Sequence, residues 1–188
     1  MLLTSSNLSN QLLIAMPAMD DPNFARTVTL ICEHNDEGCF GVTINRPIEI
    51  TIGDLLQQLE IASIEQKLLD STAVNGGPVQ SNQGFVLHDT KRSWQGTLKI
   101  SDNLAITSSR DILDAIAIGE GPDNFLLTLG CASWSPGQVE DELRENAWLT
   151  CPVDHRILFD TPYDERWVSA ANTLGIDVNL ISDTIGHA

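Results

Sequence analysis

Basic residues are scarce in this sequence of 188 residues. It holds 10 Lys and Arg against 26 Asp and Glu, which gives a formal net charge of −16 at pH 7. No cluster of basic residues occurs along the chain. Affinity for nucleic acids rests largely on Lys and Arg that neutralise phosphates, so this composition argues against direct DNA or RNA binding. An acidic surface is still suited to a basic protein partner.

Signals for export or membrane insertion are also lacking. No Lys or Arg precedes Arg26, so the positively charged start of a secretory leader is missing. The longest early apolar run, from Leu12 to Met19, is interrupted by Pro17 and is too short to cross a bilayer. The sequence has no C-x-x-C pair among its four cysteines. We expect a cytoplasmic protein with reduced thiols and no membrane partner.

The regular alternation of strands and helices that a doubly wound sheet requires is absent, and there is no internal repeat. Strand patterns dominate the first half of the chain, and helical patterns are interspersed irregularly. Apolar residues make up 42% of the chain, which is enough for a buried core. These patterns predict an α+β fold with a mixed sheet. Since no linker divides the chain, we expect a single domain over residues 1–188, with 1–10 as a loose lead-in or one helical turn.

Two β-branched segments, 27–34 and 39–45, form the most regular pattern in the sequence. They are joined by Asn35-Asp36-Glu37-Gly38, in which Gly38 supplies the positive φ that a tight hairpin needs. Further strands are predicted at 12–16, 84–88, 97–100, 125–129, 148–151 and 156–159. Helical segments are predicted at 51–59, 63–69, 108–117, 138–148 and 161–174, the first of them opened by a capping box of Thr51 and Asp54.

A loop of small residues and a helix start follow the predicted strand 125–129. Ser135 fits the N-cap of that helix, with Pro136 at its first position and Gln138 at its third. Cys131 would then lie near a helix N-terminus, where a thiolate is stabilised. Its surroundings do not match a nucleophile elbow, and no histidine is its neighbour in sequence. We therefore expect Cys131 to be a structural residue of the core.

Two patterns could hold a metal ion. Cys32, His34 and Cys39 share one face of the predicted hairpin, but a structural zinc site needs four ligands and the usual close pairs are missing. The helix after Gln138 carries several carboxylates, which we interpret as a solvated face because no oxygen-rich loop accompanies them. We predict no metal, no other cofactor and no identifiable catalytic residue.

Backbone N–H groups remain as candidates for binding chemistry. The glycine-rich turn at 75–78 and the helix N-terminus near Ser135 could both present N–H groups to an anion. The turn lacks the Lys-Ser/Thr of a P-loop and the spacing of a dinucleotide fingerprint. The candidate ligand or partner surface comprises Asn75, Gly76, Gly77, Pro78, His88, Ser133, Trp134, Ser135 and Gln138.

Several short motifs occur in order over nearly the whole chain, from Leu12 to Ala188. They are Leu13–Pro17, Ile31–Asn35, Gly41–Pro47, Gly76–Val79, Gly84–His88, Ser108–Asp111, Trp134–Gln138, Glu142, Asn146–Leu149 and Gly175–Asp177. Together they resemble the YqgE/AlgH family of small bacterial proteins, whose molecular function is undefined. The chain departs from the family pattern at Cys131, where an aromatic residue is more usual, and at Ser133, where glycine is more usual.

The resemblance implies an α+β fold in which a small barrel-like sheet is surrounded by helices. It also implies a loose link to transcriptional control of exopolysaccharide (alginate) production, and it brings no agreed catalytic residue. We predict a cytoplasmic, non-catalytic binding or regulatory module that acts through a protein or small-molecule partner. The alternative is a hydrolase or phosphate-ligand enzyme whose site combines Gly76-Gly77, His88 and the helix start at Ser135. That alternative requires His88 and Ser135 to border one concave pocket.

Overall fold

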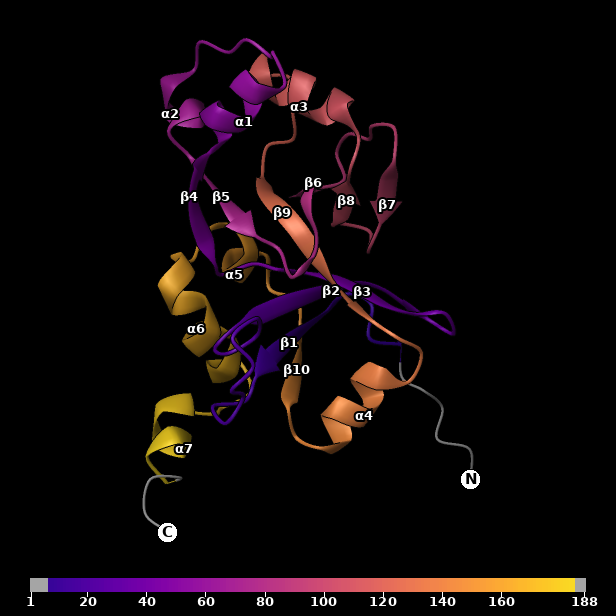
Figure 1. The fold of residues 1–188 in the computed structure, drawn as a ribbon, viewed down its shortest axis with the longest axis vertical. Helices are drawn as coiled ribbons and strands as arrows, with labels where there is room; N and C mark the ends of the chain where they lie inside the picture. The colour runs from indigo at the N-terminus through magenta and orange to yellow at the C-terminus, as the bar shows by residue number, and fades with distance from the viewer. Residues whose placement is uncertain (1–6, 185–188) are drawn as a thin grey trace.

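The strand β9 (Phe125–Trp134) connects two parts of a curled ten-stranded sheet in the computed structural model, which describes residues 7–184 (Figure 1). Its last residues pair antiparallel with β3 (Gly38–Thr43), where Trp134 lies opposite Cys39. Its first residues pair antiparallel with β6 (Val79–His88). The strand therefore belongs to both parts of the sheet, and it bends at Gly130, whose φ is 77°.

The first part of the sheet is antiparallel and runs in the order β10-β1-β2-β3. Besides β3 it contains β1 (Gln11–Ala15), β2 (Val28–Asn35) and β10 (Trp148–Pro152). The predicted hairpin is confirmed, because Asn35 lies opposite Gly38 and Gly38 has a φ of 131°. Strand β1 lies between β2 and β10, so the start of the chain is paired with a segment near its end.

The second part of the sheet contains both antiparallel and parallel pairs. Antiparallel to β6 runs β8 (Ala105–Thr107), which pairs with β7 (Thr97–Lys99). On the other side of β9, β5 (Thr72–Asn75) runs parallel to it and antiparallel to β4 (Pro47–Thr51). The predicted mixed sheet is thus confirmed, although β4, β5 and β8 were not expected.

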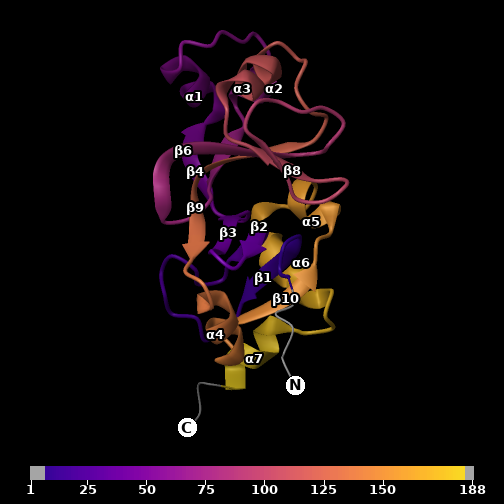
Figure 2. The same ribbon diagram turned by 90° about the vertical axis from the view of Figure 1, so that its right-hand side faces the viewer.

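The helices lie at the two ends and along one side of the sheet (Figure 2). At one end are α1 (Ile52–Gln58), α2 (Gln66–Leu69) and α3 (Arg110–Ala117). The remaining helical segments are α4 (Gln138–Arg144), α5 (His155–Phe159), the 3₁₀ turn η1 (Tyr163–Glu165), α6 (Arg166–Asn172) and α7 (Val178–Thr184). No helix among the described residues is long and apolar enough to cross a membrane.

The predicted capping box of α1 is present. The Thr51 hydroxyl accepts from the backbone N–H of Asp54 at 3.0 Å, and the Asp54 carboxylate accepts from the N–H of Thr51 at 2.9 Å. This reciprocal pair satisfies two N–H groups that the helix start would otherwise leave without partners. The helix then buries Ile52 and Leu56 against the sheet.

Three segments differ from the sequence-based expectation. Residues 156–159 form helix α5 rather than a strand, because the Asp154 carboxylate caps the backbone N–H of Arg156 at 2.9 Å. The helix predicted at 138–148 ends at Arg144, since Asn146 has a φ of 57° and β10 begins two residues later. The predicted loop at 130–133 belongs to β9. Within the predicted lead-in 1–10, residues 1–6 lie outside the described residues.

Three clusters of buried side chains fill the spaces between sheet and helices. The main cluster joins β1, β2 and β3 to α5 and α6 and includes Leu12, Leu30 and Leu158. A second lies under α4 and contains Trp134 and Trp148. The third lies under α1 and α3. The helices pack on one curled sheet through these separate clusters, so the predicted α+β fold with a barrel-like sheet surrounded by helices is confirmed.

Candidate functional site

The predicted surface residues are distributed along the whole length of β9. The turn 75–78 lies beside its middle, where a Cβ on Gly77 would come within 2.3 Å of the carbonyl oxygen of Cys131. Ser133 and Trp134 form its last residues and lead into Ser135. His88 lies opposite Phe125, at the first residue of the strand. The structure therefore places the turn next to the strand and separates His88 from Ser135.

The glycine-rich turn has no N–H group free for an anion. The backbone N–H of Gly76 donates to the carbonyl of Leu129 at 2.8 Å. The N–H of Gly77 donates to the Asn75 side chain at 3.0 Å, and Pro78 has no N–H. Both glycines are buried, and both lack a Cβ because β9 approaches too closely to admit one. Their role is close packing of backbone against backbone.

The helix start near Ser135 is a turn rather than the predicted N-cap. The N–H of Gln138 donates to the carbonyl of Ser135 at 3.0 Å, and Gly137 has a φ of 80°. Pro136 and Gly137 thus occupy the central positions of a type II turn. Helix α4 begins at Gln138 with Gly137 as N-cap, so the predicted N-cap at Ser135 is wrong by two residues. The Gln138 side chain still accepts from the N–H of Ser135 at 3.0 Å, so one half of the capping box is present.

His88 is fully buried and its two ring nitrogens are occupied. Nδ1 lies 2.6 Å from the carbonyl oxygen of Asp89, and Nε2 lies 2.7 Å from the hydroxyl of Thr107. A neutral ring with its proton on Nδ1 satisfies both contacts, since the Thr107 hydroxyl can donate to Nε2. Burial is the main cause that lowers the pKa of His88 below its usual value. His88 therefore cannot border the surface that includes Ser135.

Trp134 also lies inside the molecule, in an aromatic cluster with Trp148 and Phe24. The Nε1–H groups of Trp134 and Trp148 both donate to one carboxylate oxygen of Glu142, at 3.0 and 2.8 Å. The other oxygen accepts from the Gln138 side chain at 2.9 Å. Glu142 is one of the carboxylates after Gln138 that the sequence predicts on a solvated helix face, whereas in the structure it is the acceptor that joins α4 to two buried indoles.

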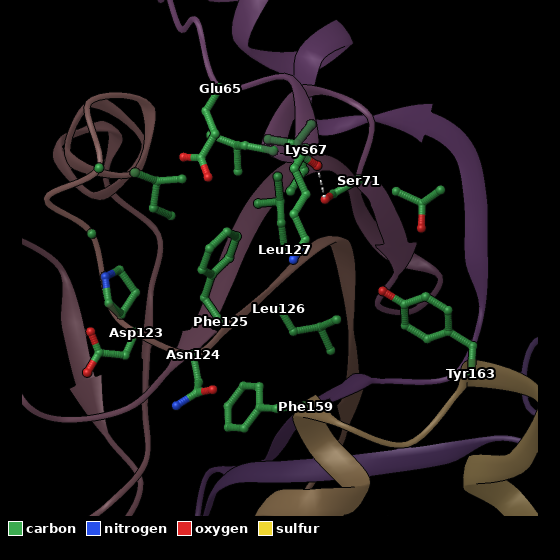
Figure 3. Close-up of a pocket in the computed structure, with 17 residues that line it drawn as sticks. Glu65, Lys67, Ser71, Asp123, Asn124, Phe125, Leu126, Leu127, Phe159 and Tyr163 are labelled. Atoms are coloured by element: carbon green, nitrogen blue, oxygen red, sulfur yellow. Dashed lines mark hydrogen bonds between the residues drawn. The ribbon is translucent and has the colours of Figure 1, made fainter.

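A cavity of about 520 Å³ lies where the start of β9 faces α2, α5 and η1 (Figure 3). Its walls include the rings of Phe125, Phe159 and Tyr163, and buried Leu126 and Leu127 line it from β9. Its volume is within the range of roughly 300 to 1,000 Å³ that is typical of small-molecule sites. None of the residues predicted as a binding surface lines this cavity.

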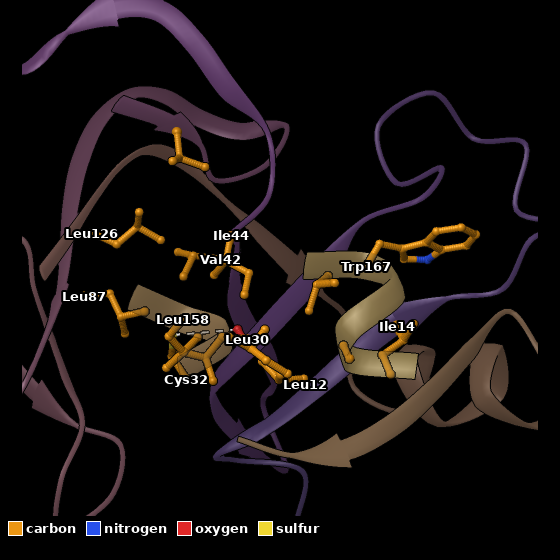
Figure 4. Close-up of a cluster of buried hydrophobic side chains, with 14 of the residues drawn as sticks. Leu12, Ile14, Leu30, Cys32, Val42, Ile44, Leu87, Leu126, Leu158 and Trp167 are labelled. Carbon is orange, nitrogen blue, oxygen red and sulfur yellow. Dashed lines mark hydrogen bonds between the residues drawn. The ribbon is translucent and has the colours of Figure 1, made fainter. Parts of the chain in front are cut away.

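The four cysteine thiols are buried in the core, and none of them lines that cavity. Cys131 is 3% exposed in the middle of β9, opposite Val79, and not near a helix N-terminus. Burial raises the pKa of its thiol, as it does for Cys151, and it raises the pKa of Cys39 to about 12. Cys32 lies in the core beside Leu30 and Leu158, and burial raises the pKa of its thiol strongly (Figure 4). All four cysteines are free thiols.

The hairpin residues weighed as zinc ligands do not form a metal site. His34 lies opposite Cys39, as the hairpin register predicted, but Cys32 lies at a bulge and packs into a different cluster. The His34 ring accepts from the N–H of Leu8 through Nδ1 at 3.1 Å and faces Glu140 through Nε2 at 2.9 Å. Within residues 7–184, no group of three or more His, Cys, Asp or Glu side chains could hold a metal ion.

Comparison with known proteins agrees with this architecture. The family model described as AlgH-like matches residues 12–179. A UPF0301 protein of Nitrosococcus oceani is 50% identical over 179 residues, covering 95% of this chain and 96% of its own length. One from Xanthomonas campestris is 48% identical over 181 residues, covering 96% of both chains.

Two solved structures share the fold. The solution structure of AlgH from Pseudomonas aeruginosa has a TM-score of 0.80 at 47% identity and covers 98% of each chain. A crystal structure from Corynebacterium diphtheriae has a TM-score of 0.74 at 19% identity, covering 93% of this chain and 91% of its own, which shows a shared fold alone. The names of these proteins assign no reaction.

Proposed function

The chain belongs to the AlgH-like family, and on this premise we propose that it is a non-catalytic binding protein whose small-molecule partner occupies the cavity between β9, α2 and α5. The observation that carries the proposal is a contrast between two kinds of site. The buried thiols and His88 are held in the core, whereas the cavity reaches solvent and has three aromatic rings among polar and apolar walls. A ligand in this cavity would therefore lie apart from the four thiols and from His88.

A regulatory role is compatible with binding at this position. Phe125 belongs to the second part of the sheet, whereas Phe159 and Tyr163 follow β10 of the first part. A ligand that contacts all three rings would connect the two parts that β9 joins. It would favour whichever arrangement of these parts it contacts more extensively, which is the physical basis of a ligand-controlled switch. We expect no direct DNA contact in this role, because the net charge is −16.

The enzyme alternative loses its geometric basis. It required His88 and Ser135 around one pocket, and they lie at opposite ends of β9. The glycine-rich turn, which could have offered N–H groups to an anion, has those of Gly76 and Gly77 bonded to Leu129 and Asn75.

A ligand screen with a cavity-filling variant tests the proposal. Thr72 lines the cavity and is exposed at the start of β5, so Thr72→Trp should fill the space without disturbing the core. Asn103→Trp adds the same side chain to an exposed loop elsewhere. In a fragment screen followed by NMR, we expect compounds that bind the native protein and Asn103→Trp but not Thr72→Trp. These compounds should be recovered unchanged after prolonged incubation. The proposal fails if no compound distinguishes the two variants, or if bound compounds are converted to products.

A further inference from the structure

Lys67 is set apart from every other cationic side chain of this acidic protein. The chain has 10 Lys and Arg residues, all within residues 7–184. Lys91, Lys99, Arg110, Arg144 and Arg156 form ion pairs with carboxylates. The other partnered residues are Arg26 over the Trp167 ring, Arg46 and Arg92 on backbone carbonyls, and Arg166 on carbonyls and the Tyr163 ring. Lys67 has no such partner among the described residues, although acidic side chains outnumber basic ones by 26 to 10.

The Lys67 side chain enters the cavity. Figure 3 shows it extending from α2 toward β9 among the residues that line the cavity, and Lys67 as a whole is exposed to solvent. The backbone of Lys67 is fixed, because its carbonyl accepts from the Ser71 hydroxyl at 2.8 Å. A cation that has no protein partner and faces a preformed cavity is available to an anionic group of a ligand.

The hydroxyl of Tyr163 is a second unused donor in the same cavity. Figure 3 shows it directed toward the space under Lys67, and it has no hydrogen bond among the described residues. The ring itself is held in place by Arg166, whose guanidinium carbon lies 4.4 Å from the ring centroid. Arg166 is in turn anchored by the carbonyl oxygens of Ile44 at 2.6 Å and Thr161 at 2.8 Å. The hydroxyl is therefore oriented before any ligand arrives.

The remaining walls define the body of the ligand. Phe125 and Phe159 add two further half-buried rings, and the chain contains only 10 aromatic residues in total (4 Trp, 1 Tyr and 5 Phe). Three aromatic side chains around one space favour a planar ring, because aromatic pairs gain stability from offset or edge-to-face contact. A flexible aliphatic chain would gain only the burial of its area.

The charges at the rim limit the ligand to a single negative charge. Glu65 and Asp123 line the same cavity, and Asp123 is already paired with Lys91. A phosphate group carries close to two charges and needs several donors, whereas Lys67 and Tyr163 supply one cation and one hydroxyl. A carboxylate has one charge and two oxygens, which matches one ammonium and one hydroxyl.

We propose that this cavity binds a planar aromatic monocarboxylate, with its ring among Phe125, Phe159 and Tyr163 and its carboxylate on the Lys67 ammonium and the Tyr163 hydroxyl. The inference rests on the proposed function and specifies its ligand class. It assigns Lys67 as the residue that distinguishes an acid from its neutral analogue.

A matched pair of probes tests the ligand class. 2-Naphthoate has the proposed planar ring and charge, and 2-naphthamide has the same shape without the charge. Calorimetry or NMR titration should show that the native protein binds the naphthoate more tightly than the amide. Lys67→Met should weaken naphthoate binding by about tenfold, the usual effect of losing a charge-assisted hydrogen bond, and should leave amide binding unchanged. Tyr163→Phe should weaken naphthoate binding by a smaller factor.

Lys99→Met is the control for net charge, because Lys99 pairs with Asp102 on the surface outside this cavity. Unfolding curves of each variant establish that it remains folded. If the amide binds as tightly as the naphthoate, or if Lys67→Met and Lys99→Met have equal effects, the carboxylate class is overturned while the binding function stands. If neither probe binds, the aromatic class is overturned as well. The binding function itself fails only if the fragment screen with Thr72→Trp is also negative.

Discussion

A single carboxylate holds α4 against the far end of β9. Glu142 accepts from the indole N–H groups of Trp134 and Trp148, which are 3% and 2% exposed. Buried donors of this kind need a partner, because water cannot reach them. The motifs around Trp134 and Trp148 therefore describe one hydrogen-bonded unit in the fold, and Glu142 is its centre.

Removing that carboxylate should destabilise the protein markedly. Glu142→Ala leaves two buried indole N–H groups without acceptors, each of which costs about 1 to 3 kcal/mol. We expect the free energy of unfolding to fall by roughly 2 to 6 kcal/mol in urea denaturation. Glu145→Ala changes an exposed carboxylate near the end of the same helix and should alter stability by less than about 0.5 kcal/mol. Similar losses in the two variants would contradict the role assigned to Glu142.

His88 should make the stability of the protein sensitive to mild acid. Its folded-state pKa lies below the usual value of 6.5, because burial disfavours the charged ring. The unfolded chain then binds the proton more readily, so the contribution of neutral His88 is complete above pH 6.5 and declines as the pH falls below it. His88→Gln retains a polar side chain but does not titrate.

The measurement is the difference in unfolding free energy between the native protein and His88→Gln. This difference should stay constant between about pH 7 and 8. As the pH falls toward about 5, the native protein should lose stability relative to His88→Gln. Subtracting the variant removes the contribution of the carboxylates, which both proteins share. A difference that is independent of pH, or that grows in acid, would show that the folded state does not resist protonation of this ring.

At the scale of elements, the bend of β9 depends on one glycine. Gly130 has a φ of 77°, and a Cβ there would lie 2.6 Å from the carbonyl oxygen of Gly77. The glycine-rich turn and the bend are thus two sides of one close contact between backbones. A side chain at Gly77 or at Gly130 would force the glycine-rich turn away from β9.

Gly119 provides a matched control for this bend. It has the same φ of 77°, but no atom lies within 4 Å of the place where its Cβ would be. Gly119→Ala should cost about 1 to 2 kcal/mol through its left-handed conformation alone. Gly130→Ala adds a clash with backbone and should cost about 3 kcal/mol or more, measured by chemical denaturation. Equal costs would indicate that β9 can relax at Gly130 without disturbing the turn.

Some elements can be predicted locally, and others depend on distant contacts. The hairpin with Gly38 and the capping box of Thr51 and Asp54 depend only on residues that are close in sequence. The sequence therefore predicts both of them correctly. The strand β4 begins at a proline and has exposed residues, and β5 ends in a glycine turn, so neither shows a strand pattern. Segment 156–159 is short and apolar, and only the Asp154 cap decides in favour of a helix.

At the scale of the whole molecule, the cavity could not be predicted from the sequence. Lys67, Phe125 and Tyr163 belong to three elements far apart in the chain, and each looks ordinary within its own segment. The sequence contains no motif for this cavity. It shows only that aromatic residues and cations are few, so that each of them is worth locating in the structure. The predicted surface relied on glycines and a helix start, and the structure uses those features for packing and for a turn.

The central strand also determines when the fold can be completed during synthesis. Strands β3, β5 and β6 all leave the ribosome before β9, so their pairing edges stay open until residue 134 has emerged. Strand β1 can pair with β10 only later, when Pro152, the partner of Gln11, has been synthesised. A domain assembled from such distant pairings folds slowly and exposes unpaired strands while it is translated. The nascent chain is therefore most vulnerable to aggregation during the interval before β9 is available.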